Sequence, residues 1–142
     1  MVGAMDRSFA RERARVAADA SRPLVVRRAA ARVATRQPDG IEVLLEHLAE
    51  AGPHSHPEIA DITLQAALRT RIPAAEARLV ELLPEATGAL REVVVRLAAY
   101  ALGPEVERQL AAMAVGHPEA AVRRDAATSL ERLRRNRRSR GG

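Results

Sequence analysis

The sequence predicts an all-α fold in which short helices are arranged as repeated pairs. The composition is dominated by Ala, Leu, Val, Arg and Glu, with one Phe, one Tyr and no Trp, which is typical of helices packed on small residues. Proline and glycine recur at intervals, and the apolar residues between them follow a helical period. The 142 residues fit a single domain with its own core.

Proline and glycine divide the chain into about eight helical runs. Pro is favoured at the first position of a helix and Gly just beyond its end, so each break marks a boundary. Pro84 falls inside the fifth run, and we expect it to end or kink that helix. The breaks are Ser21-Arg22-Pro23, Asp39-Gly40, Gly52-Pro53, His56-Pro57, Ile72-Pro73, Thr87-Gly88, Gly103-Pro104 and His117-Pro118.

Between the breaks, apolar side chains recur three and four positions apart, so that each run carries one apolar stripe. This spacing predicts amphipathic helices that bury one face each. Examples are Ile41, Leu44, Leu45 and Leu48; Val106, Leu110 and Met113; and Val122, Ala126, Leu130 and Leu133.

A β-branched residue followed four positions later by Ala recurs along the chain and indicates a repeat. The steps between copies lie within or near the range of helical repeat proteins, and the last step is the shortest. Arg follows the β-branched residue in three copies and Thr63 in the other, and we expect these arginines to serve packing between repeats. The pairs are Val26/Ala30, Ile62/Ala66, Val95/Ala99 and Val122/Ala126, and the arginines are Arg27, Arg96 and Arg123.

The run from His117 to Leu130 resembles the second helix of a HEAT repeat of the short bacterial, PBS-lyase-type kind, and the run from Val95 to Leu102 is similar to it. The resemblance covers about residues 20–135 and is strongest in the last two repeats. It implies a right-handed α-solenoid of about four HEAT-like helix pairs, used chiefly as a scaffold for protein interaction. HEAT repeats usually carry Asp or Asn just before the second helix. This chain has Ser21, His56, Gly88 and His117 in roughly those places.

Residues 1–135 are therefore interpreted as a single HEAT-like repeat domain. Residues 136–142 contain several arginines and end in two glycines, which predicts a disordered, solubilising tail.

Charge is segregated along the chain. Residues 1–36 hold nine Arg and three acids, residues 37–120 hold six Arg and thirteen acids, and residues 121–142 hold eight Arg and two acids. No lysine occurs, which together with the alanine content suggests a GC-rich bacterial genome. Basic ends and an acidic middle either steer a charged partner or form ion pairs with each other inside the fold.

The interpretation that we favour is a noncatalytic adaptor that binds another protein. The second helices of the pairs are expected to line a concave face, with Tyr and Arg as preferred anchors. Self-association is a further prediction, since a short stack leaves two end faces to cover. The predicted contacts are Arg27, Asp61, Gln65, Arg96, Tyr100 and Arg123.

The alternative is nonspecific binding of nucleic-acid phosphates by the two basic ends. Few aromatic side chains are present for stacking on bases, so such binding is expected to be sensitive to salt. A competing interpretation pairs the first arginine stripe internally with Glu42, Glu46 and Glu50. The candidate arginines are Arg7, Arg11 and Arg15 near one end and Arg134, Arg135, Arg137 and Arg138 near the other.

No enzymatic activity, cofactor or metal is predicted. Four histidines occur, none beside a Ser or Cys nucleophile in a known arrangement. His54-Ser55-His56 lacks a helical His partner, so Ser55 or His56 is interpreted as a helix cap rather than a zinc ligand. Charged residues follow Met5 directly and no apolar run approaches a membrane span, so a cytoplasmic location away from membranes is expected.

Overall fold

The computed structural model describes residues 2–141, and within them the chain is all-helical, as predicted, with eight α-helices and no strand. Most of the predicted breaks separate one α-helix from the next, and two short 3-10 segments end the third and sixth helices. The break predicted at Asp39-Gly40 is wrong, because both residues lie in the first turn of a helix that begins at Pro38. Between the breaks Gly52-Pro53 and His56-Pro57 the chain forms a 3-10 segment and no α-helix. The elements are α1 (Val2–Ala18), α2 (Leu24–Ala34), α3 (Pro38–Ala51), η1 (Gly52–His54), α4 (Pro57–Arg69), α5 (Ala74–Leu82), α6 (Gly88–Leu97), η2 (Ala98–Tyr100), α7 (Pro104–Gly116) and α8 (Ala120–Gly141).

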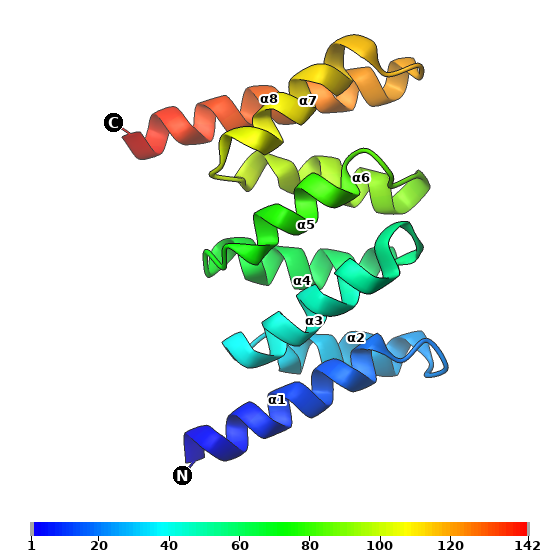
Figure 1. Ribbon diagram of the computed structural model, residues 1–142, viewed down its shortest axis with the longest axis vertical. Coiled ribbons are helices and arrows are strands. Elements are labelled where there is room, and N and C mark those ends of the chain that lie inside the picture. The colour runs from blue at the N-terminus through cyan, green and yellow to red at the C-terminus, as the bar shows by residue number, and fades with distance from the viewer. Residues whose placement is uncertain (1, 142) are drawn as a thin grey trace.

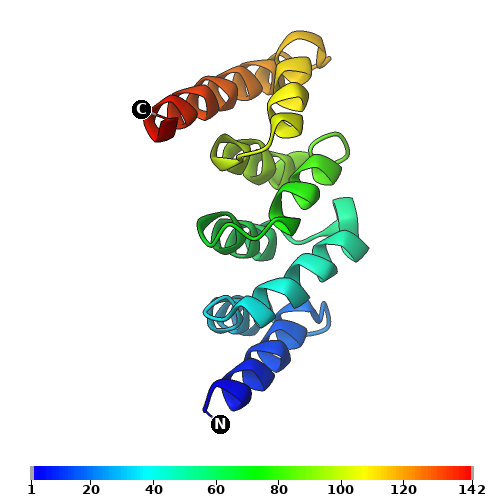
Figure 2. The ribbon, with the colours of Figure 1, turned by 60° about the vertical axis from the view of Figure 1, so that its left-hand side comes forward.

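The helices stack in two layers along the long axis of the molecule (Figures 1 and 2). In the odd layer α1 packs on α3, α3 on α5, and α5 on α7; in the even layer α2 packs on α4, α4 on α6, and α6 on α8. Most sequential helices also contact each other across the layers, and α7 contacts η2, which follows α6. The two chain ends therefore lie at opposite ends of the stack (Figure 1).

The even helices recur with a more regular step than the sequence pattern suggested. Their first residues are nearly evenly spaced along the chain, whereas the Val/Ala pattern steps unevenly and shortens towards the C-terminus. Val122/Ala126 stands at the third and seventh positions of α8, but Ala99 lies beyond the end of α6, in η2. Because Ala is abundant in the chain, a β-branched residue followed four positions later by Ala also occurs at positions that are not equivalent in successive even helices. The even helices begin at Leu24, Pro57, Gly88 and Ala120.

His56 caps α4, because its Nδ1 accepts a hydrogen bond from the Glu58 backbone N–H at 3.2 Å, a donor in the first turn with no partner within the helix. Nδ1 of His117 accepts a similar bond from the Glu119 N–H at 3.0 Å, in the turn just before α8. The interpretation of His56 as a cap is confirmed.

The core differs along the stack. Around α1 and α2 it is built mainly from alanine, namely Ala14, Ala17, Ala30, Ala31 and Ala34, joined by Leu44 and Ile59. From α3 to α8 it contains larger side chains such as Leu64, Leu79, Val94 and Leu110. Since each buried methylene contributes roughly 0.8 kcal/mol, the first helix pair has the weaker packing.

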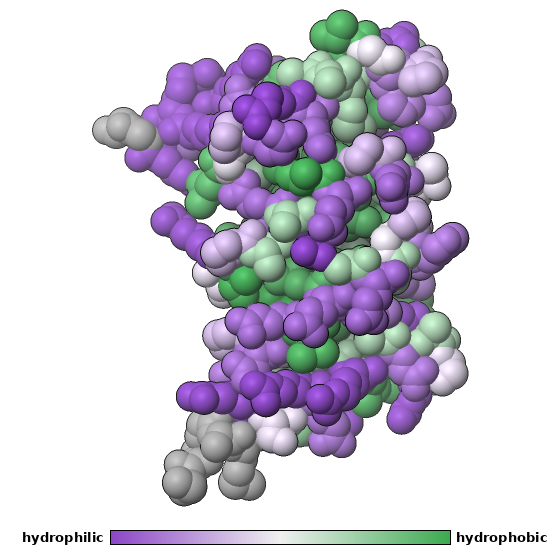
Figure 3. Space-filling view, in the orientation of Figure 1, coloured by the Kyte–Doolittle hydropathy of each residue, from purple (hydrophilic) through white to green (hydrophobic). Residues whose placement is uncertain are grey.

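Hydrophilic side chains cover most of the face that Figure 3 displays, and its apolar areas are small and separate. That face therefore presents no single large apolar patch of the kind that marks an obligate interface.

The C-terminal part of α8 differs from the sequence prediction. Residues 136–141 continue the helix instead of forming a disordered tail, while residue 142 lies outside the described residues. Ser129 Oγ donates to the Val95 carbonyl at 2.6 Å, and Asn136 Nδ2 donates to the Ala99 carbonyl at 3.0 Å. Arg137 binds the Gly103 carbonyl and the Glu107 carboxylate. α8 therefore supplies partners to carbonyl groups near the end of α6, where intrahelical donors run out.

Candidate functional site

The clearest candidate site lies on the even layer, where three adjoining hollows share one residue, Arg96. The first, of about 440 Å³, lies between α6 and α8. The second, of about 330 Å³, lies where α4, α6, η2 and α8 meet. The third, of about 210 Å³, lies between α4 and α6. Arg96 lines all three, so the hollows form a connected, furrowed surface over α4, α6 and α8, which we call the even face.

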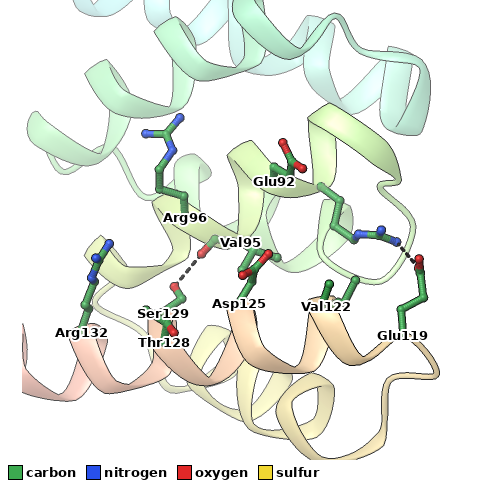
Figure 4. Close-up of a pocket in the computed structure, with 11 residues that line it drawn as sticks. Glu92, Val95, Arg96, Glu119, Val122, Asp125, Thr128, Ser129 and Arg132 are labelled. Carbon is green, nitrogen blue, oxygen red and sulfur yellow. Dashed lines mark hydrogen bonds and ion pairs between the residues drawn. The ribbon is translucent and has the colours of Figure 1, made fainter.

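The first hollow has a rim of both charges (Figure 4). Arg91 from α6 reaches Glu119, just before α8, at 3.2 Å. The buried bond from Ser129 to the Val95 carbonyl joins the two helices at the floor. The remaining charged residues on the rim are Glu92, Arg96, Asp125 and Arg132.

Three of the predicted contacts form one polar cluster. An Arg96 Nη lies 2.8 Å from an Asp61 carboxylate oxygen, across the contact between α6 and α4. The other oxygen of Asp61 accepts a hydrogen bond from Gln65 Nε2 at 2.6 Å. Arg96 and Gln65 are exposed, so the cluster is open to a partner while its charges are already matched.

Tyr100, the predicted aromatic contact, lies in η2 and is 50% exposed. It lines the second hollow together with Arg69 at the end of α4 and Arg140 near the end of α8. The structure thus brings together Asp61, Gln65, Arg96 and Tyr100 on one surface.

Arg27 and Arg123 do not join that surface. The exposure predicted for Arg27 is wrong, because the residue is 8% exposed and its Nε donates to the Ala17 carbonyl at 2.8 Å, at the end of α1. Arg123 donates to the carbonyls of His117 and Pro118, in the turn before α8. Both arginines satisfy backbone acceptors left open by a helix end or a turn.

Most of the arginines proposed for nucleic-acid binding are engaged within the fold. Arg11 pairs with Asp39 at 2.7 Å, Arg135 with Glu131 at 3.2 Å, and both Arg134 and Arg137 with Glu107. Arg7, Arg15 and Arg138 have no ion pair with any side chain that the structure describes. The two groups also belong to opposite ends of the stack, so they do not form one basic surface (Figure 1).

Within a layer, ion pairs between neighbouring helices occur chiefly in the even layer. Arg28 of α2 pairs with Glu58 of α4 at 3.0 Å, which adds to the Asp61–Arg96 and Arg91–Glu119 pairs further along the stack. In the odd layer the pairing predicted between the first arginine stripe and Glu42, Glu46 and Glu50 is replaced by Arg11–Asp39. The three glutamates line a hollow shared with α5 instead.

Two titratable groups have shifted pKa values. Burial and the nearby positive charge of Arg27 lower the pKa of His47, while Glu50 acts in the opposite direction. Hydrogen bonds from the side chain and backbone of Ser21 lower the pKa of Asp19, in the turn after α1. Neither residue lines the even face.

Among the side chains that the structure describes, those of residues 7–140, no group of three or more His, Cys, Asp or Glu is placed to hold a metal ion. Within residues 2–141 no helix combines the length and apolarity that crossing a membrane requires.

Sequence reasoning missed several residues of the even face. Arg69, Glu92, Thr128, Arg132 and Arg140 line its hollows without standing at the Val/Ala pattern. Pro57, Gly88 and the His117-Pro118 break mark the starts of three even helices in the sequence. If positions are counted from the start of each helix, Glu92 and Thr128 fall on comparable helix faces.

Neither a scan against protein-family models nor searches of curated proteins and solved structures found a match to this chain.

Proposed function

We propose that this chain is a noncatalytic interaction module that acts in the cytoplasm and binds another protein through the even face. The observation that carries the proposal is the set of three hollows joined at Arg96, beside an exposed Tyr100. Tyr and Arg are over-represented among residues that dominate binding energy, particularly where they border a pocket.

We also assign the stack to the HEAT-like type, as four helix pairs in a right-handed α-solenoid with the even face on its concave side. The two-layer packing and the nearly even spacing of the even helices along the chain support this assignment.

A test of the function uses the tagged full-length chain to retrieve its partner from an extract of cells that produce it. Arg96→Glu removes the residue common to the three hollows and should abolish retrieval, and Tyr100→Ala should weaken it. Arg108→Glu on α7 is the matched control, because Arg108 is exposed in the odd layer and pairs only with Glu105 in its own helix. Equal retention of the partner by all three variants would contradict the proposal.

Nucleic-acid binding is separated from protein binding by its salt dependence. Ion pairs already occupy four of the seven arginines that were candidates for phosphate binding, namely Arg11, Arg134, Arg135 and Arg137. We therefore expect no shift of labelled DNA or RNA at about 50 mM salt. A shift that disappears steeply as salt rises would favour phosphate binding over the adaptor function.

A further inference from the structure

The second hollow of the even face has a distinct composition and is called here the Tyr100 pocket. Its residues come from four elements: Gln65, Leu68 and Arg69 from α4, Arg96 and Leu97 from α6, Tyr100 from η2, and Arg140 from α8. Its volume is about 330 Å³. α8 extends past the end of α6 in Figure 1, and it is this extension that brings Arg140 to the pocket.

The charged side chains that line the Tyr100 pocket are all positive. Three arginines and no carboxylate are found among the described residues that line it. Arg96 is neutralised by Asp61 at 2.8 Å, whereas Arg69 and Arg140 form no ion pair with a described side chain. The neighbouring hollows are different, because Glu92 lines both of them and Asp61 or Asp125 adds a further carboxylate to each. Among the three hollows of the even face, the Tyr100 pocket is therefore the one lined by positive charge without a matching carboxylate.

The pocket also offers apolar surface. Tyr100 is half exposed, Leu68 is partly buried, and Leu97 forms part of the buried floor. A half-exposed aromatic ring next to two leucines suits an aliphatic or aromatic side chain of a ligand. Two guanidinium groups beside that surface suit carboxylates, which they bind through paired N–H donors.

We propose that the Tyr100 pocket binds an acidic peptide segment of the partner protein. One apolar side chain of the segment packs against Tyr100 and Leu68, and its flanking carboxylates pair with Arg69 and Arg140. This inference rests on the proposed function and specifies the chemistry of the partner at one part of the even face.

A peptide fits these observations better than a nucleic acid does. Binding to phosphates calls for a continuous row of free cations, whereas the pocket has two arginines without an ion pair to a described side chain and an apolar wall between helices. Stacking of successive bases calls for several aromatic side chains, and Tyr100 is the single tyrosine of the chain, which has one phenylalanine and no tryptophan.

The test measures binding of a fluorescein-labelled peptide, Asp-Glu-Leu-Phe-Glu-Asp, to the full-length chain by fluorescence anisotropy. Two control peptides replace either Leu-Phe with Gly-Ser or all four acids with Lys. A labelled single-stranded oligothymidine is the nucleic-acid control. The protein variants are Arg69→Glu combined with Arg140→Glu, Tyr100→Ala, and the matched control Arg36→Glu, since Arg36 is exposed near the opposite end of the stack.

The proposal predicts that the acidic peptide binds and that the lysine peptide does not. The double Arg variant should weaken binding by at least about tenfold, while Arg36→Glu should leave it within about twofold. Tyr100→Ala should weaken binding of the Leu-Phe peptide and leave the Gly-Ser peptide unaffected. Circular dichroism of each variant confirms that the helices remain folded.

Three results would overturn the proposal. The first is absence of binding by the acidic peptide at about 1 mM. The second is an equal loss in Arg36→Glu, which would indicate an effect of net charge alone. The third is tighter binding of oligothymidine through Arg69 and Arg140. If the peptide fails while Arg96→Glu still abolishes partner retrieval, the proposed function survives and only the acidic-segment inference is lost.

Discussion

Gly40 lies in the first turn of α3, where that helix passes the end of α2. A Cβ atom added at this position would lie 2.8 Å from the carbonyl carbon of Ala34 and closer still to its oxygen. Because the obstacle is backbone, a side chain can be accommodated only if the two helices move apart.

Gly40→Ala is therefore expected to lower the free energy of unfolding by about 1 to 3 kcal/mol, as overpacking does elsewhere. Gly116→Ala is the control, since a Cβ atom there meets nothing within 4 Å. Ala is a better helix former than Gly, so this control should be neutral or stabilising by up to roughly 1 kcal/mol. Urea unfolding of both variants checks the prediction, and equal stability of the two would contradict it.

His47 is expected to make the stability depend on pH. Burial, and then the charge of Arg27, lower its pKa in the folded chain, so between that pKa and about 6.5 the unfolded chain binds more protons. The free energy of unfolding should consequently fall as pH decreases below about 6.5. His47→Gln should reduce this decline, as measured by urea midpoints across the range. His54→Gln, which changes an exposed histidine in η1, should leave the decline unchanged.

Arginines that share one sequence pattern make different contacts in the structure. Arg27 binds the end of α1, Arg96 binds Asp61 on α4, and Arg123 binds the turn before its own helix. An arginine side chain is long and has five donors, so its partner depends on which acceptors lie within reach. A short sequence pattern predicted that these residues pack, but the acceptors come from the three-dimensional arrangement.

At the scale of the element, α8 is the helix that departs most from the sequence prediction. Its last residues are rich in arginine, which is typical of a solvated tail. Three of its side chains, Ser129, Asn136 and Arg137, lie on one helical face and contact backbone carbonyls around the end of α6 and the turn that follows. These acceptors lie between Val95 and Gly103, far from α8 in the sequence, so no local pattern reveals them.

Replacement of Arg137 by Ala is expected to loosen the last turns of α8. The variant loses the contacts to two backbone carbonyls and the ion pair with Glu107. A hydrogen bond to a charged group contributes about 1.5 to 3 kcal/mol to stability. Hydrogen exchange of amides after residue 133 should accelerate. Arg138→Ala removes an exposed neighbour without an ion pair in the described chain, and faster exchange in that variant as well would argue against specific docking.

The first helix pair is expected to open before the middle of the stack. α1 and α2 pack through alanines and have neighbours on one side only, whereas α5 and α6 contact larger side chains on both sides. Amides of α1 and α2 should therefore exchange with clearly lower protection than those of α5 and α6. Uniform protection along the stack would show that it unfolds as a single cooperative unit.

At the scale of the whole molecule, ion pairs within the fold neutralise part of the segregated charge. Arg11–Asp39 and Arg28–Glu58 join the basic N-terminal segment to the acidic middle, and Glu107 holds two arginines of α8. Exposed pairs of this kind contribute only about 0 to 1 kcal/mol each, so they align the helices more than they stabilise the fold. On the even face, the hollow lined by arginines without a carboxylate among its described residues is the Tyr100 pocket.

The helices themselves could be predicted from the sequence, because breaks and apolar stripes are local signals. The site could be predicted in part: Asp61, Gln65, Arg96 and Tyr100 do lie together on the even face, whereas Arg27 is buried. Arg69 in α4 and Arg140 in α8 are distant in the sequence and meet only because α8 extends past α6. Their proximity depends on the length of α8 and on how the helices stack, and neither is specified by the amino-acid composition or by the helical period of the apolar residues.

The central claim, that the even face binds a partner protein, is tested most directly by site-specific photocrosslinking in living cells. A photoreactive residue replaces Thr128, which lines the first hollow, or Ala112, which is exposed on α7 in the odd layer. The account predicts a discrete crosslinked protein from position 128, its loss when Arg96→Glu is added, and no such product from position 112. A product from position 112 alone, or equal products from both positions, would contradict it.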